Sequence, residues 1–469
     1  MILKARSERP EQSELAALLV IAAPLAATQL SQLAMSLIAS FALGRLDSAA
    51  FAAGGICAII IQTITVVSQG LIAGVQPLLA ADRGARFERI EGDGLGVKGF
   101  AGAYVLALAL SLLAVIALYN LGQLLVLFQF DPLVIEKAER FVRPAAWSLP
   151  AVLLLAPMRF HLAVEQRTWV IMLAACGGVA VYSGLLMLLV FGPMTLGIAG
   201  AGLALTITWW LITAAVALYL WVGRLFPAGL AELSVADLKA GVLAVFGIGW
   251  PIAVIYGAEL GLTTVLALLV GSFGTMSMAA HQVTHSINSV AFMPAVALGQ
   301  AVTVRVAYHM GRRRADAARA AGNLALVVVA VQMSLLGVAV VLFSDQITLL
   351  FIGADNPDAG RIMAITRTLN VILALFLIFD GFQAVASGAL RGLKDTRVPM
   401  LLGVFSYWVI GLPLALLTAF HLGLGPAGIW IGILGGIGTV ACLLLYRWHK
   451  RTAIKAVPLQ ALTPEPAQR

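Results

Sequence analysis

Two acidic residues, Glu259 and Asp380, stand near the middle of long apolar stretches, where carboxylates are rare. A charge at the centre of a spanning helix costs roughly 2.5 to 3.5 kcal/mol on insertion scales, so an acid kept there is a functional candidate. The alternative is that both acids are protonated and hydrogen-bonded to nearby backbone. The placement favours the first reading, a site for cations or protons.

Polar neighbours accompany both acids. Tyr256 and Gln383 each lie three residues from one of them, on the same helix face. The segment 281–289 is also unusually polar, with His281, Gln282, Thr284, His285, Ser286, Asn288 and Ser289. We expect it to line a wet cavity, although hydrogen bonding between helices would also explain it. Two histidines four apart are too few ligands for a typical metal site, so we expect no metal centre and no cofactor.

The composition predicts a polytopic membrane protein. Of 469 residues, 61% are hydrophobic and 11% are charged, far below the usual quarter of charged residues in soluble domains. Apolar stretches of about 20 residues or more can each cross a bilayer. About twelve such spans are predicted, at 15–43, 51–80, 97–119, 140–163, 169–191, 197–222, 241–270, 276–306, 320–343, 364–390, 399–420 and 424–447.

Basic residues gather in alternate loops, which predicts the orientation in the membrane. Arg and Lys are concentrated in the N-terminal segment, in 83–98, 312–319 and 391–397, and after 447. Because short basic loops stay in the cytoplasm, both termini are predicted to be cytoplasmic and the protein to lie in the inner membrane. The net charge of +8 then reflects topology. It does not indicate nucleic-acid binding, since the basic residues are dispersed.

An internal repeat divides the chain. At an offset of 227, Pro24 matches Pro251 and Gly84 matches Gly311, and with one inserted residue Thr168 matches Thr396. Two six-helix halves follow, which enter the membrane in the same sense and enclose a pathway at their interface. The predicted organisation is an N-terminal tail (1–14), an N-lobe (15–225), a cytoplasmic linker (226–240), a C-lobe (241–450) and a C-terminal tail (451–469).

Several motifs resemble those of multidrug and toxic compound extrusion (MATE) transporters, in the NorM-like branch. They are Gly44-Arg45-Leu46, Trp250-Pro251-Ile252 with Glu259, Ala279-Ala280-His281-Gln282, Asp380-Gly381, Ala389-Leu390-Arg391-Gly392 and Lys394–Met400. The resemblance covers about residues 15 to 447. It implies that Glu259 and Asp380 are acids for cation coupling and substrate binding, and that Gln282 contacts substrate. It also places Asp355 near the outer mouth.

One position departs from that family's pattern. Relatives usually carry an aspartate in the first span, five residues before the glycine that aligns with Gly44, and this sequence has Ala39 there. Coupling is therefore expected to depend on the C-lobe acids.

The sequence thus predicts an antiporter that exports cationic amphipathic drugs or metabolites in exchange for Na⁺ or H⁺. Tyr256, Gln282, Gln383, His285, Asn288 and Asp355 are the predicted additional substrate contacts. Carboxylate oxygens suit Na⁺, whereas burial would make an acid a proton carrier, so both ions stay open. We expect a monomer. Two alternatives are a lipid-linked oligosaccharide flippase, which would need basic cavity residues, and an intramembrane enzyme, for which no catalytic constellation stands out.

Overall fold

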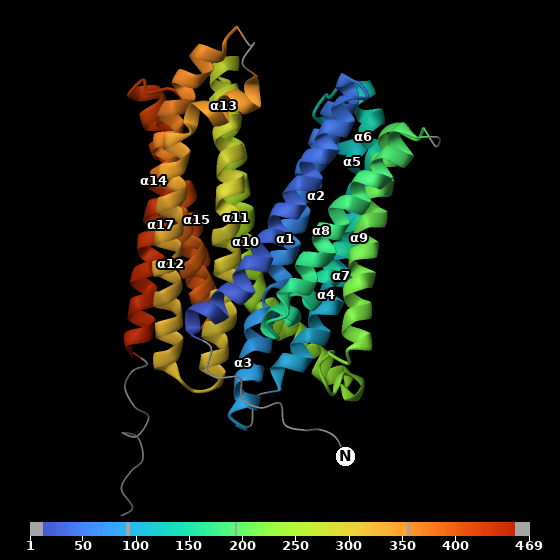
Figure 1. The fold of residues 1–469 in the computed structure, drawn as a ribbon, viewed down its shortest axis with the longest axis vertical. Coiled ribbons are helices and arrows are strands. Elements are labelled where there is room, and N and C mark those ends of the chain that lie inside the picture. Colours follow the sequence, from blue (N-terminus) through green and yellow to red (C-terminus); the bar gives the residue numbers. More distant parts are fainter. Residues whose placement is uncertain (1–12, 91–93, 193–194, 354–356, 455–469) are drawn as a thin grey trace, which may run out of the picture.

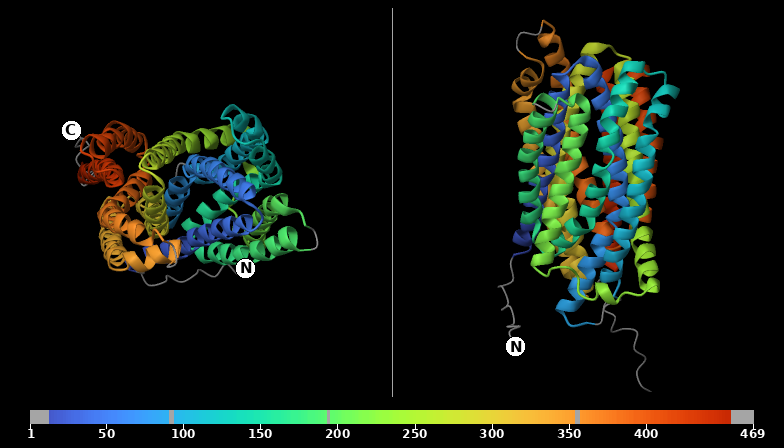
Figure 2. Two further views of the ribbon diagram at one scale, coloured as in Figure 1. Left: turned by 90° about the horizontal axis from the view of Figure 1, so that it is seen from above. Right: turned by 90° about the vertical axis from the view of Figure 1, so that its right-hand side faces the viewer.

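The chain folds into two bundles of long helices that meet at one end (Figure 1). The computed structural model describes residues 13–90, 94–192, 195–353 and 357–454, and every regular element in these ranges is helical. The bundles converge at the end that carries α3 (Val75–Phe87) and diverge toward the end that carries α13 (Ser344–Ile352). Seen from above, the N-terminal and C-terminal helices occupy largely opposite sides (Figure 2).

The first bundle contains the elements that precede residue 225. Besides α3, these are α1 (Glu14–Gly44), α2 (Ser48–Ile72), α4 (Leu95–Tyr119), α5 (Leu121–Leu127), α6 (Pro132–Ala145), α7 (Ser148–Val164), α8 (Thr168–Leu186), the π-helix η1 (Met187–Phe191) and α9 (Gly197–Val222).

The second bundle follows the 3₁₀ turn η2 (Leu230–Glu232). Besides α13, it contains α10 (Val235–Gly271), α11 (Thr275–Gly311), α12 (Ala315–Leu342), α14 (Ala359–Gly392), α15 (Arg397–Val404), the π-helix η3 (Phe405–Gly411), α16 (Leu412–Leu416), the π-helix η4 (Leu417–His421) and α17 (Pro426–Ile454).

The helices account for all twelve predicted spans. In the described part of the chain, eleven helical segments are long and apolar enough to cross a membrane, and α6 and α7 make a twelfth if they are taken together. These two meet at a 42° bend. The bend follows Pro144, which lies at the end of α6 and cannot donate the backbone hydrogen bond that a continuous helix needs.

The predicted linker is shorter than expected, because α10 begins at Val235 rather than near residue 241. Ser234 and Asp237 form a reciprocal capping box that starts the helix in a polar segment. Hydropathy alone misses this first turn, since it is not apolar. Residues 1–12 and 455–469 lie outside the described residues, and so do the basic residues in these two ranges.

Helices α1 and α10 connect the two bundles at the end where they converge. Helix α1 packs against α11 of the second bundle, and α10 packs against α2 and α4 of the first. These two helices are the ones that the repeat superposes, since Pro24 lies inside α1 and Pro251 inside α10. The N-terminal half of α10 packs against α2 and α4 of the first bundle. The C-terminal half, which carries Glu259, faces α15 and η3 of its own bundle.

Candidate functional site

The structure brings Glu259 and Asp380 together inside the second bundle. Glu259 projects from α10 and is partly exposed, whereas Asp380 on α14 is only 2% exposed to solvent. Their carboxyl groups are close enough for their charges to repel each other. Two acids 121 positions apart in sequence thus form one cluster, which hydropathy could suggest only by placing both at similar depth.

Tyr407 connects the two helices at this cluster. Its hydroxyl donates to Glu259 Oε2 at 3.4 Å and accepts from Gln383 Nε2 at 3.0 Å. Tyr407 is 1% exposed and lies in η3, a π-helical stretch of the span that follows α15. Such stretches often occur at functional sites. The sequence analysis did not single out Tyr407. The available signal was a lone tyrosine within an apolar span, between Gly403 and Gly411.

One buried oxygen of the cluster has no partner among the described residues. Asp380 Oδ1 is inaccessible to solvent and accepts no hydrogen bond. A buried acceptor left unpaired costs free energy, about 1 to 3 kcal/mol or more when it is charged. The cluster offers two carboxylates and a phenol oxygen, a donor set that suits a proton or a hard cation such as Na⁺.

An aromatic and histidine wall lies next to the acids, toward the end where the bundles diverge. The His281 ring lies 5.8 Å from that of Trp430 on α17, and Trp430 lies 6.1 Å from Phe376, one turn before Asp380 on α14. His285 follows one turn after His281, with the two rings 6.0 Å apart. His281 is buried and its Nδ1 has no partner among the described residues.

The other predicted substrate contacts do not all belong to this cluster. Gln383 belongs to it through Tyr407, and Asn288 on α11 has a buried Oδ1 that no described residue satisfies. The Gln282 side chain is exposed, and no hydrogen bond described for it reaches the acids. Asp355 lies outside the described residues. No group of three or more His, Cys, Asp or Glu suitable for a metal occurs in the described ranges.

Tyr256 contacts a residue that the sequence analysis assigned to a basic loop. Arg391, at the end of α14, is only 7% exposed and its Nη2 donates to the Tyr256 hydroxyl at 3.3 Å. A second buried arginine, Arg159 on α7 of the first bundle, is also 7% exposed and donates to Gln69 Oε1 at 3.0 Å. The sequence analysis placed Arg391 in a basic loop, whereas the structure places it in the last turn of α14 and buries it.

The first bundle has no acid at the position that corresponds to this cluster. Ala39 packs at the edge of a separate apolar core that contains Phe141 and Tyr182. Gln32, which the repeat places opposite Glu259, is partly exposed and carries an amide rather than a carboxyl group. The chemistry of the two halves therefore differs while their helical scaffold is shared.

Three groups of ion pairs join the bundles where they converge. Glu14 on α1 accepts two hydrogen bonds from Arg305 on α11, both at 2.7 Å. Glu88 pairs with Arg312 at 2.7 Å, and Lys98 on α4 pairs with Asp237 on α10 at 2.8 Å. The Arg312 hydrogen bond lowers the pKa of Glu88 below its ordinary value.

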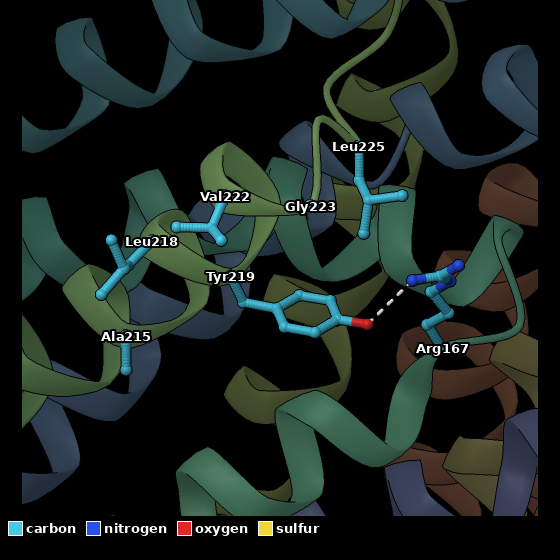
Figure 3. A pocket seen from close by; sticks show the side chains of 7 residues that line it. All are labelled: Arg167, Ala215, Leu218, Tyr219, Val222, Gly223 and Leu225. Atoms are coloured by element: carbon cyan, nitrogen blue, oxygen red, sulfur yellow. Dashed lines mark hydrogen bonds between the residues drawn. The ribbon is translucent and has the colours of Figure 1, made fainter. Parts of the chain in front are cut away.

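A groove on the outer surface of the first bundle is separate from the acid cluster (Figure 3). It encloses about 480 Å³ and is lined by Arg167, Ala215, Leu218, Tyr219, Val222, Gly223 and Leu225. Arg167 Nη1 donates to the Tyr219 hydroxyl at 2.9 Å. None of its lining residues belongs to the predicted site.

The fold and site define a polytopic helical membrane protein with a carboxylate cluster buried between its spans. The chain belongs to the MatE family, whose model matches it twice, at residues 24–186 and 251–417. The two matches begin at Pro24 and Pro251, the positions that the internal repeat aligns.

Curated relatives cover nearly the whole chain. The multidrug resistance protein NorM of Burkholderia vietnamiensis is 38% identical over 92% of this chain and 93% of its own. A probable multidrug resistance protein NorM of Pseudomonas aeruginosa is 34% identical over 95% of this chain and 91% of its own. Families of this kind are transporters rather than enzymes, so the enzyme alternative is excluded.

Solved structures confirm the fold. A eukaryotic MATE transporter, AtDTX14, matches with a TM-score of 0.80 and 23% identity, over 94% of this chain and 98% of that one. A MATE structure described as being in the bent conformation matches with a TM-score of 0.84 and 19% identity, over 95% of this chain and 96% of that one.

Proposed function

We propose that the protein is a multidrug efflux antiporter that exchanges cationic amphipathic compounds for Na⁺ or H⁺ at the Glu259–Asp380 cluster. The observation that carries this proposal is the buried Oδ1 of Asp380, which no described residue hydrogen-bonds, beside a second carboxyl group. Because two neighbouring carboxylates repel each other, the pair is stabilised when one site takes up a proton or a metal cation. The NorM names of the curated relatives support multidrug export over a flippase.

Competition for this cluster couples the two fluxes. A cationic substrate and the coupling ion both neutralise the same acids, so binding of one weakens binding of the other. Reciprocity of this kind is a thermodynamic requirement of coupled sites. The aromatic rings of Trp430 and Phe376 next to the acids supply an apolar surface for the hydrophobic part of a substrate.

Alternating access is supported by the way the bundles meet. Ion pairs and close helix packing join them at the end with the basic loops, which we predict to be cytoplasmic. The opposite ends diverge (Figure 1). The structure then corresponds to an outward-open state, and rocking of one bundle against the other would break these ion pairs and open the cytoplasmic side.

Reconstitution into proteoliposomes tests the proposal, with Na⁺ and pH gradients imposed one at a time. Glu259→Gln and Asp380→Asn should each abolish efflux of a cationic dye driven by the coupling ion, because each removes a titratable ligand at nearly constant volume. The matched control is Glu136→Gln, an exposed acid paired with Arg140 on α6, which should transport normally. Full efflux by both cluster variants, at equal amounts of folded protein, would refute the proposed site.

A further inference from the structure

Two buried arginines near Tyr256 have no acidic partner among the described residues. Arg391 and Arg159 are each 7% exposed to solvent. Their described hydrogen-bond partners are uncharged: the Tyr256 hydroxyl for Arg391 and the Gln69 amide oxygen for Arg159. The Nε–H of each guanidinium is buried and donates a hydrogen bond to none of the described residues. Burying a guanidinium without a counter-charge is costly, so an anionic group bound between the two would stabilise them.

The two arginines come from different bundles and converge on the same tyrosine. The Arg391 guanidinium lies 6.0 Å from the centroid of the Tyr256 ring. Arg159 reaches the same region through its hydrogen bond to Gln69 on α2. Gly70, next to Gln69 on α2, packs directly against the ring of Tyr256. The pair therefore sits at the interface between bundles, where residues from both must rearrange during transport.

One arginine and one acid, Arg391 and Asp380, lie on the same helix, α14. Asp380 and Arg391 are eleven residues apart on α14, which is about three turns, so they lie on one face at roughly 16 Å along the axis. Side chains on a helix lean toward its N-terminus, which points Arg391 on α14 back toward Asp380. By the same rule Tyr256 on α10 leans away from Glu259 and toward Arg391, consistent with their hydrogen bond.

We propose that Arg159 and Arg391 form an anion subsite that binds the carboxylate of a zwitterionic amphiphile whose cationic group lies at Glu259 and Asp380. This inference rests on the proposed function and extends it, because it adds a second polar contact at the opposite end of the substrate. Planar guanidinium groups suit carboxylates through paired hydrogen bonds. The site would thus distinguish a zwitterion from a simple cation of the same length.

A matched ligand pair tests the subsite by calorimetry on the purified full chain. The probes are 11-(trimethylammonio)undecanoate, which carries both charges, and its methyl ester, which keeps only the cation. A hydrogen bond to a charged group contributes enough that the wild-type protein should bind the acid form roughly tenfold more tightly than the ester. Arg391→Gln and Arg159→Gln should bring this ratio close to one while leaving ester affinity unchanged.

Two controls separate the subsite from a structural role and from the acid cluster. Arg143→Gln, which alters an exposed basic residue of α6, should keep the wild-type ratio. Arg391→Lys should retain part of the preference, since it keeps the charge. Glu259→Gln should weaken both probes together. Equal binding of acid and ester by the wild-type protein would overturn the inference while leaving the cation site intact. Loss of binding of both probes in folded Arg391→Gln and Arg159→Gln proteins would also overturn the inference, because the arginines would then be required for the cation site itself.

Discussion

Gly84 and Gly311 make the same contact in opposite directions across the interface between the bundles. Gly84 on α3 lies against the Tyr308 carbonyl of α11, and Gly311 on α11 lies against the Ala81 carbonyl of α3. A β-carbon at either position would overlap the facing backbone. The two glycines are 227 positions apart, as are the two carbonyl residues. The repeat thus extends from sequence to the contact that closes the predicted cytoplasmic side.

Enlarging either glycine should therefore shift the protein away from the present arrangement. We expect Gly84→Leu and Gly311→Leu to separate the bundles at α3 and to bring their opposite ends together. With spin labels at Gln129→Cys and Gly360→Cys, in a background without native cysteines, double electron–electron resonance should report a shorter distance between the two labels. Gly177→Leu is the matched control, because a β-carbon there meets nothing within 4 Å. An unchanged distance in both interface variants would exclude this role for the glycines.

The pH dependence of the Glu88 ion pair has a definite sign. The hydrogen bond from Arg312 lowers the pKa of Glu88 below its ordinary 4.5. A lowered pKa in the folded protein gives stability that is complete above about pH 4.5 and is lost as pH falls through the folded value. The wild type should therefore melt above Glu88→Gln at pH 6, and the difference should vanish in more acidic buffer. Glu136→Gln should show little difference at any pH, because exposed pairs contribute little. A constant gap down to pH 3 would contradict this account.

Tyr407→Phe removes one hydroxyl from the acid cluster without changing the packing of the ring. The hydroxyl donates to Glu259 and accepts from Gln383, so its loss should weaken binding of the coupling ion or a cationic substrate by roughly tenfold or more. Equilibrium binding to purified protein would measure this change. Tyr182→Phe, in the apolar core of the first bundle, should leave affinity unchanged. Equal affinity in Tyr407→Phe and wild type would remove Tyr407 from the site.

Long-range patterns in the sequence predict the scaffold but not the contacts between helices. Apolar stretches and the offset between Pro24 and Pro251 predict twelve spans and two halves, because helix length and repeat register are local or periodic properties. The burial of Arg391 and the link through Tyr407 depend on how α10, α14 and η3 pack. No single segment encodes that packing, so Tyr407 went unassigned and Arg391 was assigned to a basic loop.

Orientation is a separate prediction from the fold. The concentration of basic residues in alternate loops places Arg313 in the cytoplasm and Gln129 outside. Both side chains are exposed. Gln129 follows α5, which lies at the end where the bundles diverge (Figure 1), whereas Arg313 follows Gly311, which packs against Ala81 of α3 at the opposite end. An impermeant thiol reagent applied to intact cells should label Gln129→Cys and spare Arg313→Cys until the membrane is permeabilised. The reverse pattern would place both termini outside.

Neutralising both acids should leave no titratable group able to drive transport. The first bundle has Ala39 where the family resemblance predicts an aspartate, and Gln32 where the repeat aligns Glu259. If coupling resides in the second bundle, Glu259→Gln combined with Asp380→Asn should show no efflux above the passive rate with either a Na⁺ or a pH gradient. Each imposed gradient would be checked with an independent ion indicator. A control with two exposed acids changed, Asp131→Asn and Glu136→Gln, should retain wild-type efflux. Robust gradient-driven efflux by the cluster double variant would show that the coupling ion binds in the first bundle.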